Sequence, residues 1–305
     1  MGINTTSAEF LLQAHAAGVS FGNTLTLGRQ NLSVNDGVLK RLLKRYGVSG
    51  FEKASAGNDP SENLKHGLPP YADLFFQALG ATKIDSIDAD AYQGSSIVHD
   101  MNLPILPDLH QQYDCVVDGG TLEHVFAFPT AIRNCMEMVK PGGHLILLTP
   151  ANNFFGHGFY QFSPELFFRV LSPENGFCVE RMIVIETENL AYRTQGRICS
   201  YEEHGRPYEV LDPAVTRKRG TLRNSKSVLL YVQAKRQADV PIFTKAPQQS
   251  DYVTLWHESE QGRSPQPSVR FFKTLRARLK EFVPPYFMVR YYQRLASLRN
   301  RDFFR

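Results

Sequence analysis

The sequence predicts an α/β protein with a doubly wound, mostly parallel sheet and a helical C-terminal extension. Between residues 24 and 234, apolar runs of strand length alternate with amphipathic stretches of helix length. Strands that alternate with helices form a mostly parallel sheet, which the helices cover on both faces. Acidic residues follow three of these runs. Because such sheets bind ligands at the carboxyl ends of their strands, these acids mark the expected binding edge.

The composition is that of a globular protein. Of the 305 residues, 42% are hydrophobic and 21% are charged, which is enough to build a large core. The four cysteines are scattered without a C-x-x-C pair, which indicates reduced thiols rather than disulfides or a zinc site. The sequence contains no stretch of about 18 apolar residues, so no transmembrane helix is expected. We therefore expect a cytoplasmic protein with no bound metal.

The N-terminal part of the chain begins with a helix and a strand. Residues 7–19 predict a short helix that begins at Thr6 or Ser7 and ends at Gly18. The β-branched and leucine run of residues 24–27 predicts the first strand of the sheet.

A second helix and a long loop follow this strand. Residues 34–47 place leucine and valine on one face and lysine and arginine on the other, the pattern of an amphipathic helix. Residues 48–70 are rich in Gly, Ser, Asn and Pro and predict a surface loop, and residues 71–81 a further helix. The rest of the series comprises expected strands at 83–88, 95–100, 113–118, 144–150, 177–187 and 226–234, and expected helices at 128–139 and 163–172.

Residues with binding chemistry stand where four of the predicted strands end. Gly28 follows the first strand, Asp88 ends the second, Asp100 ends the third, and Asp118 and Gly119 end the fourth. Carboxylates at these positions can accept hydrogen bonds from ribose hydroxyls or a base amino group, and glycines let a ligand approach the backbone. Because Asp is also a common N-cap, simple caps and turns are the alternative.

One stretch of the sequence resembles a known family. Residues 113–150, YDCVVDGGTLEHVFAFPTAIRNCMEMVKPGGHLILLTP, resemble the fourth strand, the L-E-H signature and the helix–KPGG–strand unit of class I S-adenosylmethionine-dependent methyltransferases. The resemblance spans about residues 20–235. It implies a Rossmann-like methyltransferase fold with seven strands, of which the last, 226–234, is antiparallel. It also implies S-adenosylmethionine as the cofactor.

The resemblance assigns roles to the residues at the strand ends. It implies that Asp88 binds the cofactor ribose, that Asp100 and Met101 hold the adenine, and that Asp118 and Gly119 line the methionine part. The reaction it implies is methyl transfer to an O or N atom of a small molecule or glycan.

The first motif departs from the family pattern. Where the family has a G-x-G-x-G loop, this chain has TLTLGRQNL, with Arg29 and Gln30 after Gly28. Neither side chain can replace a glycine at a position of close approach without moving the ligand. A non-catalytic binding or scaffold protein on the same fold therefore stays open. A nicotinamide-dependent oxidoreductase is disfavoured because G-x-G-x-x-G follows none of the strands.

Candidate catalytic and substrate residues follow the fourth and fifth strands. His124 comes directly after the predicted cofactor site and is a candidate catalytic residue. The alternative is that His124 is only a packed or solvated residue in the first turn of a helix. His157 is the preferred general base because an unperturbed imidazole has a pKa near neutrality, although methyl transfer also depends on alignment and does not require a base. The expected substrate residues, which could equally belong to a plain surface loop, are Asn152, Asn153, Tyr160 and Gln161.

The chain divides into three predicted parts. Residues 1–235 form the methyltransferase-like domain, with an insertion at 48–81 and a segment at 188–225 that is either a substrate lid or a disordered excursion. Residues 236–267 form a linker, and residues 268–305 form a basic tail of two amphipathic helices.

The basic tail has a net positive charge, whereas the rest of the chain is slightly acidic. From residue 270 onward it contains ten Lys and Arg residues and two acidic ones. Such a segment fits the surface of an anionic membrane, a protein partner, or a helix docked on the domain with a solvated basic face. A nucleic acid partner is disfavoured because the charge is confined to the tail and no reading motif is present.

Overall fold

The computed structural model describes residues 2–51, 71–91, 93–187, 205–217, 220–253, 290, 294 and 296–305. The predicted insertion, the lid-or-excursion segment, the linker and the basic tail lie partly or largely outside these residues, so the predicted domain boundaries stay predictions. Within the described ranges, no helix is long and apolar enough to cross a membrane.

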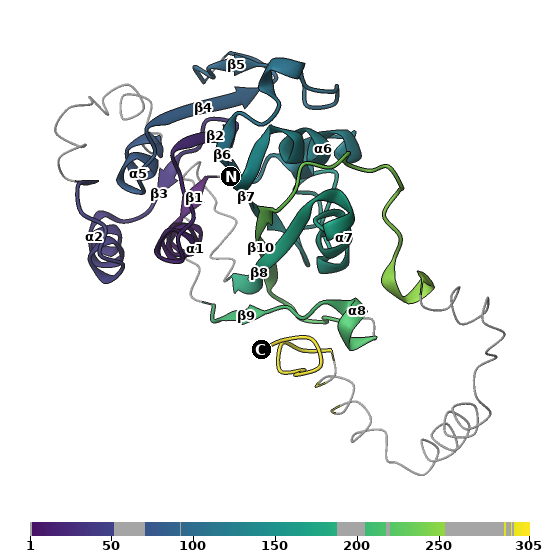
Figure 1. Cartoon of the computed structure of the whole chain (residues 1–305). Helices are drawn as coiled ribbons and strands as arrows, with labels where there is room; N and C mark the ends of the chain where they lie inside the picture. The colour runs from purple at the N-terminus through teal and green to yellow at the C-terminus, as the bar shows by residue number, and fades with distance from the viewer. Residues whose placement is uncertain are drawn as a thin grey trace, which may run out of the picture.

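One mixed sheet organises the described part of the chain, where it has eight strands in the order β5-β4-β2-β6-β7-β10-β8-β9 (Figure 1). The strands from β5 to β7 are parallel, and β10 is antiparallel to both β7 and β8. The bounds are β2 Asn23–Leu27, β4 Lys83–Asp88, β5 Ile97–Val98, β6 Tyr113–Asp118, β7 Val139–Pro150, β8 Phe177–Thr187, β9 Pro207–Glu209 and β10 Ser227–Arg236.

This order confirms a mostly parallel α/β sheet with an antiparallel strand at the position of 226–234. The predicted number of seven strands is wrong by one. The eighth is the short edge strand β9, which pairs antiparallel with β8 and places Glu209 opposite Ile183. A separate pair of two-residue strands, β1 (Ile3–Asn4) and β3 (Leu32–Ser33), joins the N-terminus to the loop that follows β2.

Helices cover both faces of the sheet, as Figure 1 shows. α1, α2 and α5 pack on one face, and α6 and α7 pack on the other. The helix bounds are α1 Thr5–Ala16, α2 Asp36–Arg45, α5 Asp73–Ala78, α6 Phe128–Met138, α7 Pro164–Val170 and α8 Pro213–Thr216. Cys115 and Val117 of β6 belong to the core under α1, whereas Val116 belongs to the core under α6. Successive residues of a strand point to opposite faces, so a central strand must be apolar throughout.

The first helix begins earlier than predicted. Its N-cap is Asn4, not Thr6 or Ser7: the Asn4 side chain accepts a hydrogen bond from the Ser7 backbone N–H, and the Ser7 hydroxyl accepts one from the Asn4 N–H. This reciprocal capping box satisfies two backbone donors that a helix start leaves unpaired. The predicted stop at Gly18 is confirmed, since Gly18 follows the helix with a φ of 94°.

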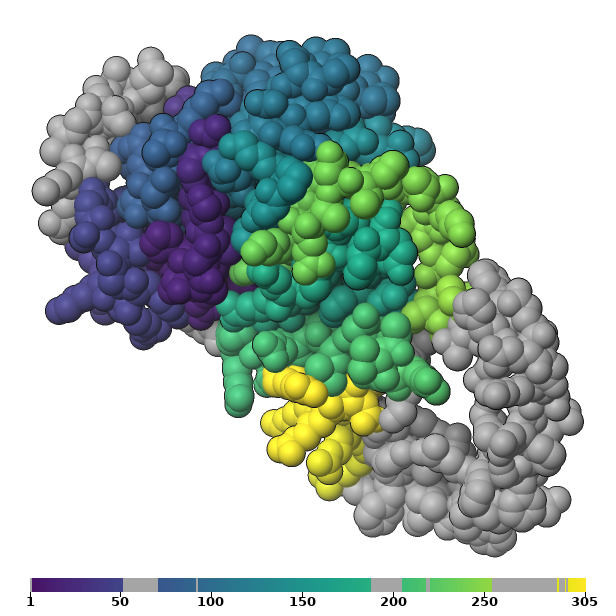
Figure 2. Space-filling view, viewed as in Figure 1, coloured from purple at the N-terminus to yellow at the C-terminus, as the bar shows by residue number. Residues whose placement is uncertain are grey.

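The described C-terminal residues, 296–305, form turns rather than a helix. They lie against the segment that carries β9 and α8, as Figure 2 shows. Glu209 and Arg305 exchange two backbone hydrogen bonds of 3.0 and 2.9 Å, and Val210 forms an isolated bridge with Phe304. The predicted tail helices fall mostly outside the described residues and stay predictions.

Arg236, at the end of β10, joins the last strand to the end of α6. Its side chain is buried, and its Nη1 donates to the backbone oxygens of Met136 and Val139 at 3.3 and 2.7 Å. Its Nη2 donates to the carboxylate of Asp239 at 2.9 Å. The last carbonyls of a helix lack partners within the helix, so this guanidinium supplies donors that the helix end requires.

Replacing Arg236 should therefore destabilise the whole domain. We expect Arg236→Met to lower the free energy of unfolding by about 2–3 kcal/mol, because buried carbonyls lose charge-assisted hydrogen bonds. Urea unfolding followed by circular dichroism measures this value. Lys235→Met, at the neighbouring and partly exposed position, is the matched control and should change it by less than about 1 kcal/mol. Equal effects of the two substitutions would contradict the assigned role of Arg236.

Candidate functional site

The carboxyl ends of β2, β4 and β6 meet at one edge of the sheet. Thr121, directly after β6, donates its hydroxyl to the backbone oxygen of Leu27 at 2.9 Å. The Gly28 N–H donates to the backbone oxygen of Ile87 at 2.8 Å. These two bonds join the loop after the central strand β2 to the strand ends on either side of it. Three predicted cofactor residues, Gly28, Asp88 and Asp118, are thereby brought to this edge.

Gly28 occupies a position that only glycine tolerates well. Its φ is 67°, and an added Cβ would lie 3.5 Å from the Thr121 hydroxyl and 3.6 Å from Oδ2 of Asp88. The left-handed backbone turns the chain away from the sheet just after β2. The ribose-binding carboxylate expected from the sequence thus lies beside the first glycine of the degenerate motif.

Asp100 and Met101 follow β5 farther along the same edge. The Asp100 carboxylate accepts hydrogen bonds from the backbone N–H and the side-chain amide of Asn102, at 2.9 and 2.8 Å. These bonds lower the pKa of Asp100 and keep it ionised. Met101 is buried in the core under α6. The Asn102 side chain also accepts from the N–H of Ala127 at 2.9 Å, which ties this loop to the start of α6.

Asp118 is a buried carboxyl group at the end of β6. Its Oδ1 accepts the Thr121 N–H at 2.8 Å, whereas its Oδ2 has no hydrogen-bond partner among the described residues. Burial, together with the nearby charge of Glu123, raises the pKa of Asp118 well above that of an ordinary carboxyl. The Oδ2 of Asp118 is therefore a buried polar atom without a hydrogen-bond partner among the described residues.

Gln30 lies over the neighbouring Gly119. An added Cβ at Gly119 would lie 2.1 Å from Oε1 of Gln30, so the two residues are in direct contact. The Gln30 side chain is buried; its Nε2 donates to the backbone oxygens of Leu27 and Gly28 at 2.5 and 3.3 Å, and its Oε1 has no partner in the described part of the chain. Gln30, one of the two bulky residues that follow Gly28, thus fills the space over Gly119.

Arg29 turns in the other direction, away from Gly119. Its guanidinium lies 3.9 Å from the ring centre of Tyr71, and its Nε lies 3.5 Å from Oδ2 of Asp73 at the start of α5. A cation–π contact and an ion pair thus hold the Arg29 side chain against the start of the neighbouring helix.

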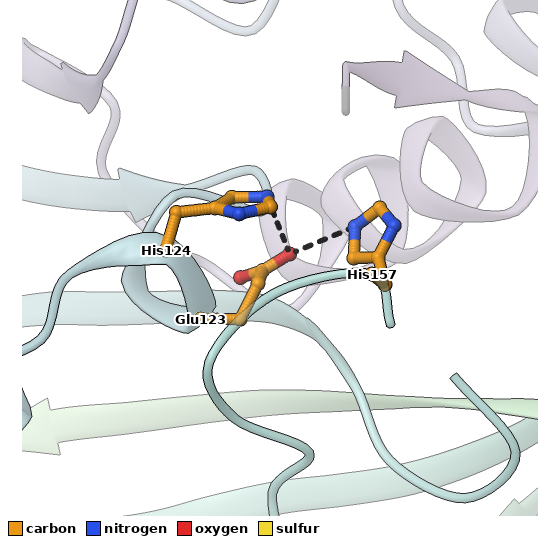
Figure 3. A group of neighbouring side chains, drawn as sticks. All are labelled: Glu123, His124 and His157. Carbon is orange, nitrogen blue, oxygen red and sulfur yellow. Dashed lines mark ion pairs between the residues drawn. The ribbon is translucent and has the colours of Figure 1, made fainter. Parts of the chain in front are cut away.

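A second group of side chains lies beside the end of β6. Glu123 and His124 belong to the 3-10 turn η2, Leu122–His124, and His157 belongs to the loop after β7. Figure 3 shows all three pointing toward one another. The Glu123 Oε1 lies 3.5 Å from the His157 Nε2 and 3.9 Å from the His124 Nε2. Burial lowers the pKa of His124, although the Glu123 carboxylate opposes the shift.

The two predicted catalytic residues, His124 and His157, thus both lie beside Glu123, whose importance the sequence does not indicate. Glu123 looks there like an acid that favours a helix N-terminus, but it is fully buried. The L-E-H signature is the signal that could have drawn attention to it, since the acid in that signature directly precedes a candidate histidine.

The four predicted substrate residues lie in the loop after β7, where their polar atoms have partners within the protein. The side-chain amides of Asn152 and Asn153 donate to Asn224, at 2.9 and 3.0 Å from its Oδ1. Gln161 accepts the Phe154 N–H at 2.8 Å, and the Tyr160 hydroxyl donates to the backbone oxygen of Phe126 at 2.6 Å. These bonds fold the loop; the substrate role of the four residues stays a prediction.

A mostly apolar cavity of about 400 Å³ opens beside this loop. Its lining includes Asn152 and Gln161 but not Asn153 or Tyr160. It lies at the carboxyl ends of β7 and β8, the same edge of the sheet as the candidate cofactor residues. The apolar lining side chains include Phe162, Val184, Leu222, Val228, Phe303 and Phe304.

Comparison with known proteins gives matches in structure only. No protein-family model matches the chain, and a sequence comparison with curated proteins finds no match. Among solved structures, the chain is similar to a SAM-dependent methyltransferase of Thermotoga maritima, with 15% identity over 77% of this chain and 91% of the other and a TM-score of 0.32. It is also similar to the N-methyltransferase NodS of Bradyrhizobium japonicum, with 13% identity over 76% and 96% and a TM-score of 0.35.

A third similar structure is not a methyltransferase by name. The branched-chain polyamine synthase of Thermus thermophilus, in complex with N4-aminopropylspermidine and 5'-methylthioadenosine, has 13% identity over 81% of this chain and 61% of the other, with a TM-score of 0.33. At such identities and scores, these similarities describe the fold and carry no argument about the reaction.

The raised pKa of Asp118 predicts how stability depends on pH. Folded Asp118 keeps its proton at pH values where the unfolded chain, with a carboxyl pKa of about 4, has released it. Its contribution is therefore complete at low pH and is lost as the pH rises toward the raised pKa. We measure the free energy of unfolding of the wild type and of Asp118→Asn in the presence of a chelator. Between about pH 5 and about pH 9, we expect this free energy to fall more in the wild type than in Asp118→Asn. Parallel pH profiles of the two proteins would show that Asp118 is ionised in the fold.

Proposed function

We propose that this protein is an S-adenosylmethionine-dependent methyltransferase that acts on an O or N atom of a small molecule or glycan. The observation that carries the proposal is the meeting of Gly28, Asp88 and Asp118 at one edge of the sheet. These residues come from three different loops, and the hydrogen bonds of Thr121 and Gly28 hold those loops together. The antiparallel β10 beside β7 supports it, because the resemblance of the sequence implies this strand.

The side chains at this edge suit the two ends of the cofactor differently. The adenosine end fits: Asp88 beside Gly28 can accept from a ribose hydroxyl, and the loop of Asp100 and Met101 offers a carboxylate and an apolar side chain to a base. The methionine end fits in charge, since the buried Oδ2 of Asp118 lacks a partner and a cationic amine would supply one. When bound, S-adenosylmethionine supplies an electrophilic methyl group on a sulfonium sulfur.

Gln30 opposes the fit at the methionine end. Its side chain fills the space over Gly119, which the family pattern leaves open with a glycine. A ligand that reaches Asp118 must displace it and break the hydrogen bond between Gln30 and Leu27. Gln30 thereby weakens binding of the cofactor. Whether the cofactor can displace Gln30 decides between an enzyme and a scaffold protein.

The cavity beside the loop after β7 is the proposed acceptor site. Its volume of about 400 Å³ suits a small molecule, and its mostly apolar lining favours an acceptor with an apolar body. Tyr160 and Phe162, stacked with ring centres 6.0 Å apart, connect this cavity to the loop that carries His157. The acceptor and the cofactor would then approach each other from neighbouring strand ends.

A non-catalytic binding or scaffold protein is the second candidate function. The contact between Gln30 and Gly119 favours it, because the Gln30 side chain fills the space that the methionine part of a cofactor would occupy. Calorimetry with S-adenosylmethionine and with its demethylated product separates the two candidates. A methyltransferase binds both ligands, whereas a scaffold protein shows no binding of either ligand at millimolar concentrations.

Asp88 should contribute directly to cofactor affinity. We expect Asp88→Ala to weaken binding of S-adenosylmethionine by about 1–3 kcal/mol, through the loss of a hydrogen bond to a ribose hydroxyl. Isothermal titration calorimetry measures the change. Asp108→Ala removes an exposed carboxylate from the turn Pro107–Leu109 and should leave the affinity unchanged. Unaltered binding in Asp88→Ala would remove Asp88 from the site.

Gln30 should act in the opposite direction. We expect Gln30→Ala to strengthen cofactor binding by about three- to tenfold, because the ligand no longer breaks a hydrogen bond worth about 0.5–1.5 kcal/mol. The control is Gln112→Ala, which removes an exposed amide that donates to the backbone oxygen of His110. A loss of affinity in Gln30→Ala would mean that the amide binds the ligand rather than blocking it.

A further inference from the structure

Glu123, His124 and His157 converge although they come from two separate loops. Glu123 and His124 stand directly after β6, and His157 stands in the loop after β7, with one nitrogen or oxygen of each within 4.8 Å of the others. In Figure 3 both imidazole rings face the same carboxylate oxygen. The ring centres of the two histidines are 5.1 Å apart.

Three buried polar atoms of this group have no hydrogen-bond partner among the described residues. Glu123 is fully buried, and neither of its carboxylate oxygens has a hydrogen-bond partner among the described residues. The same is true of the His157 Nε2. A buried carboxylate without a hydrogen bond or counter-ion costs several kcal/mol, so native folds rarely retain one without a function. Asp118, a second buried acid, lies close enough to be affected by the charge of Glu123.

The separations within the group are too long for a hydrogen-bonded dyad. An imidazole that donates to a carboxylate lies about 2.7–2.9 Å from it, whereas the two nitrogens here lie 3.5 and 3.9 Å from the Glu123 Oε1. Two ligand atoms on one tetrahedral metal ion, each about 2.0–2.1 Å from it, are roughly 3.3 Å apart. The Glu123–His157 distance of 3.5 Å is close to that spacing, and the Glu123–His124 distance of 3.9 Å is somewhat longer.

The backbone fixes this spacing before any ligand arrives. The backbone oxygen of Glu123 accepts the N–H groups of Phe159 and Tyr160 at 2.8 and 3.2 Å, which fastens the His157 loop to the Glu123 turn. Gly158 lies between them so closely that an added Cβ would be 2.7 Å from the same oxygen. Ligands that are held by the fold in this way lose little freedom when a metal binds.

We propose that Glu123, His124 and His157 bind one divalent ion of the first transition row, with Zn²⁺ as the preferred occupant. Two imidazole nitrogens and one carboxylate oxygen form a donor set that suits zinc and iron better than magnesium or calcium. Three protein ligands leave at least one coordination position open to water or to another oxygen ligand. The bound cation would also neutralise the buried carboxylate of Glu123.

The proposal changes the roles expected of the two histidines and does not depend on methyl transfer. A metal-bound imidazole has no free electron pair to accept a proton, so His124 and His157 would act as ligands rather than general bases. The proposal departs from the expectation of no bound metal that the scattered cysteines suggest.

The test uses the full chain, stripped of metal with a chelator and titrated with Zn²⁺ by calorimetry and with Co²⁺ by visible absorption. We expect one equivalent of either ion per chain. Glu123→Gln and His157→Ala should weaken Zn²⁺ binding at least tenfold. His110→Ala is the matched control: His110 faces Glu137 at 3.8 Å in an ordinary surface pair and should bind Zn²⁺ like the wild type.

Thermal unfolding separates loss of the site from loss of the fold. Zn²⁺ should raise the melting temperature of the wild type and of His110→Ala but not that of Glu123→Gln. In chelator, Glu123→Gln should melt no lower than the wild type, because it removes a buried charge without a partner. Failure of the folded wild type to bind Zn²⁺, or equal binding by the wild type and both triad variants, would overturn the proposal.

Discussion

The candidate site depends on the two hydrogen bonds of Thr121. Its hydroxyl reaches the backbone oxygen of Leu27 at the end of β2, and its N–H reaches the carboxylate of Asp118 at the end of β6. Together they fix the loop after the central strand relative to the loop after its neighbour. Gln30, which contacts Gly119, and Glu123, two residues beyond Thr121, lie on the two loops that this connection joins. A change in Thr121 would therefore affect the cofactor edge and the histidine group together.

Several buried polar atoms in this region have no hydrogen-bond partner among the described residues. They include the Asp118 Oδ2, the Gln30 Oε1 and both carboxylate oxygens of Glu123. Folded proteins satisfy most buried polar groups, and departures concentrate where a ligand completes the set. An amine near Asp118 and a cation near Glu123 would each complete part of it. The two proposals thus explain different atoms of the same cluster, and either can fail without the other.

The sequence predicts the sheet well because its strands carry a strong local signal. Residues 113–118 and 177–187, which contain apolar runs, and residues 83–88, in which two isoleucines stand among polar residues, form strands at the predicted bounds. The acids at the strand ends were also found this way, because parallel strands place their carboxyl ends at one edge. The sequence does not predict β9 because its three residues form a short edge strand and carry no apolar pattern of their own.

Contacts between loops were less predictable. Arg29 and Gln30 are adjacent and equally bulky in the sequence, yet Tyr71 and Asp73 draw one outward while Leu27 holds the other over Gly119. The approach of His157 to Glu123 rests on backbone hydrogen bonds to a single carbonyl, which no residue spacing encodes.

The most direct test of the account is a crystal structure of the protein with the demethylated cofactor product, S-adenosylhomocysteine. The account predicts the adenosyl group at the ends of β2 and β4, with a ribose hydroxyl within hydrogen-bonding distance of Asp88 and the Gln30 side chain moved away from Gly119. Crystals grown at saturating ligand in which Gln30 still covers Gly119, or in which the ligand lies elsewhere, would contradict it.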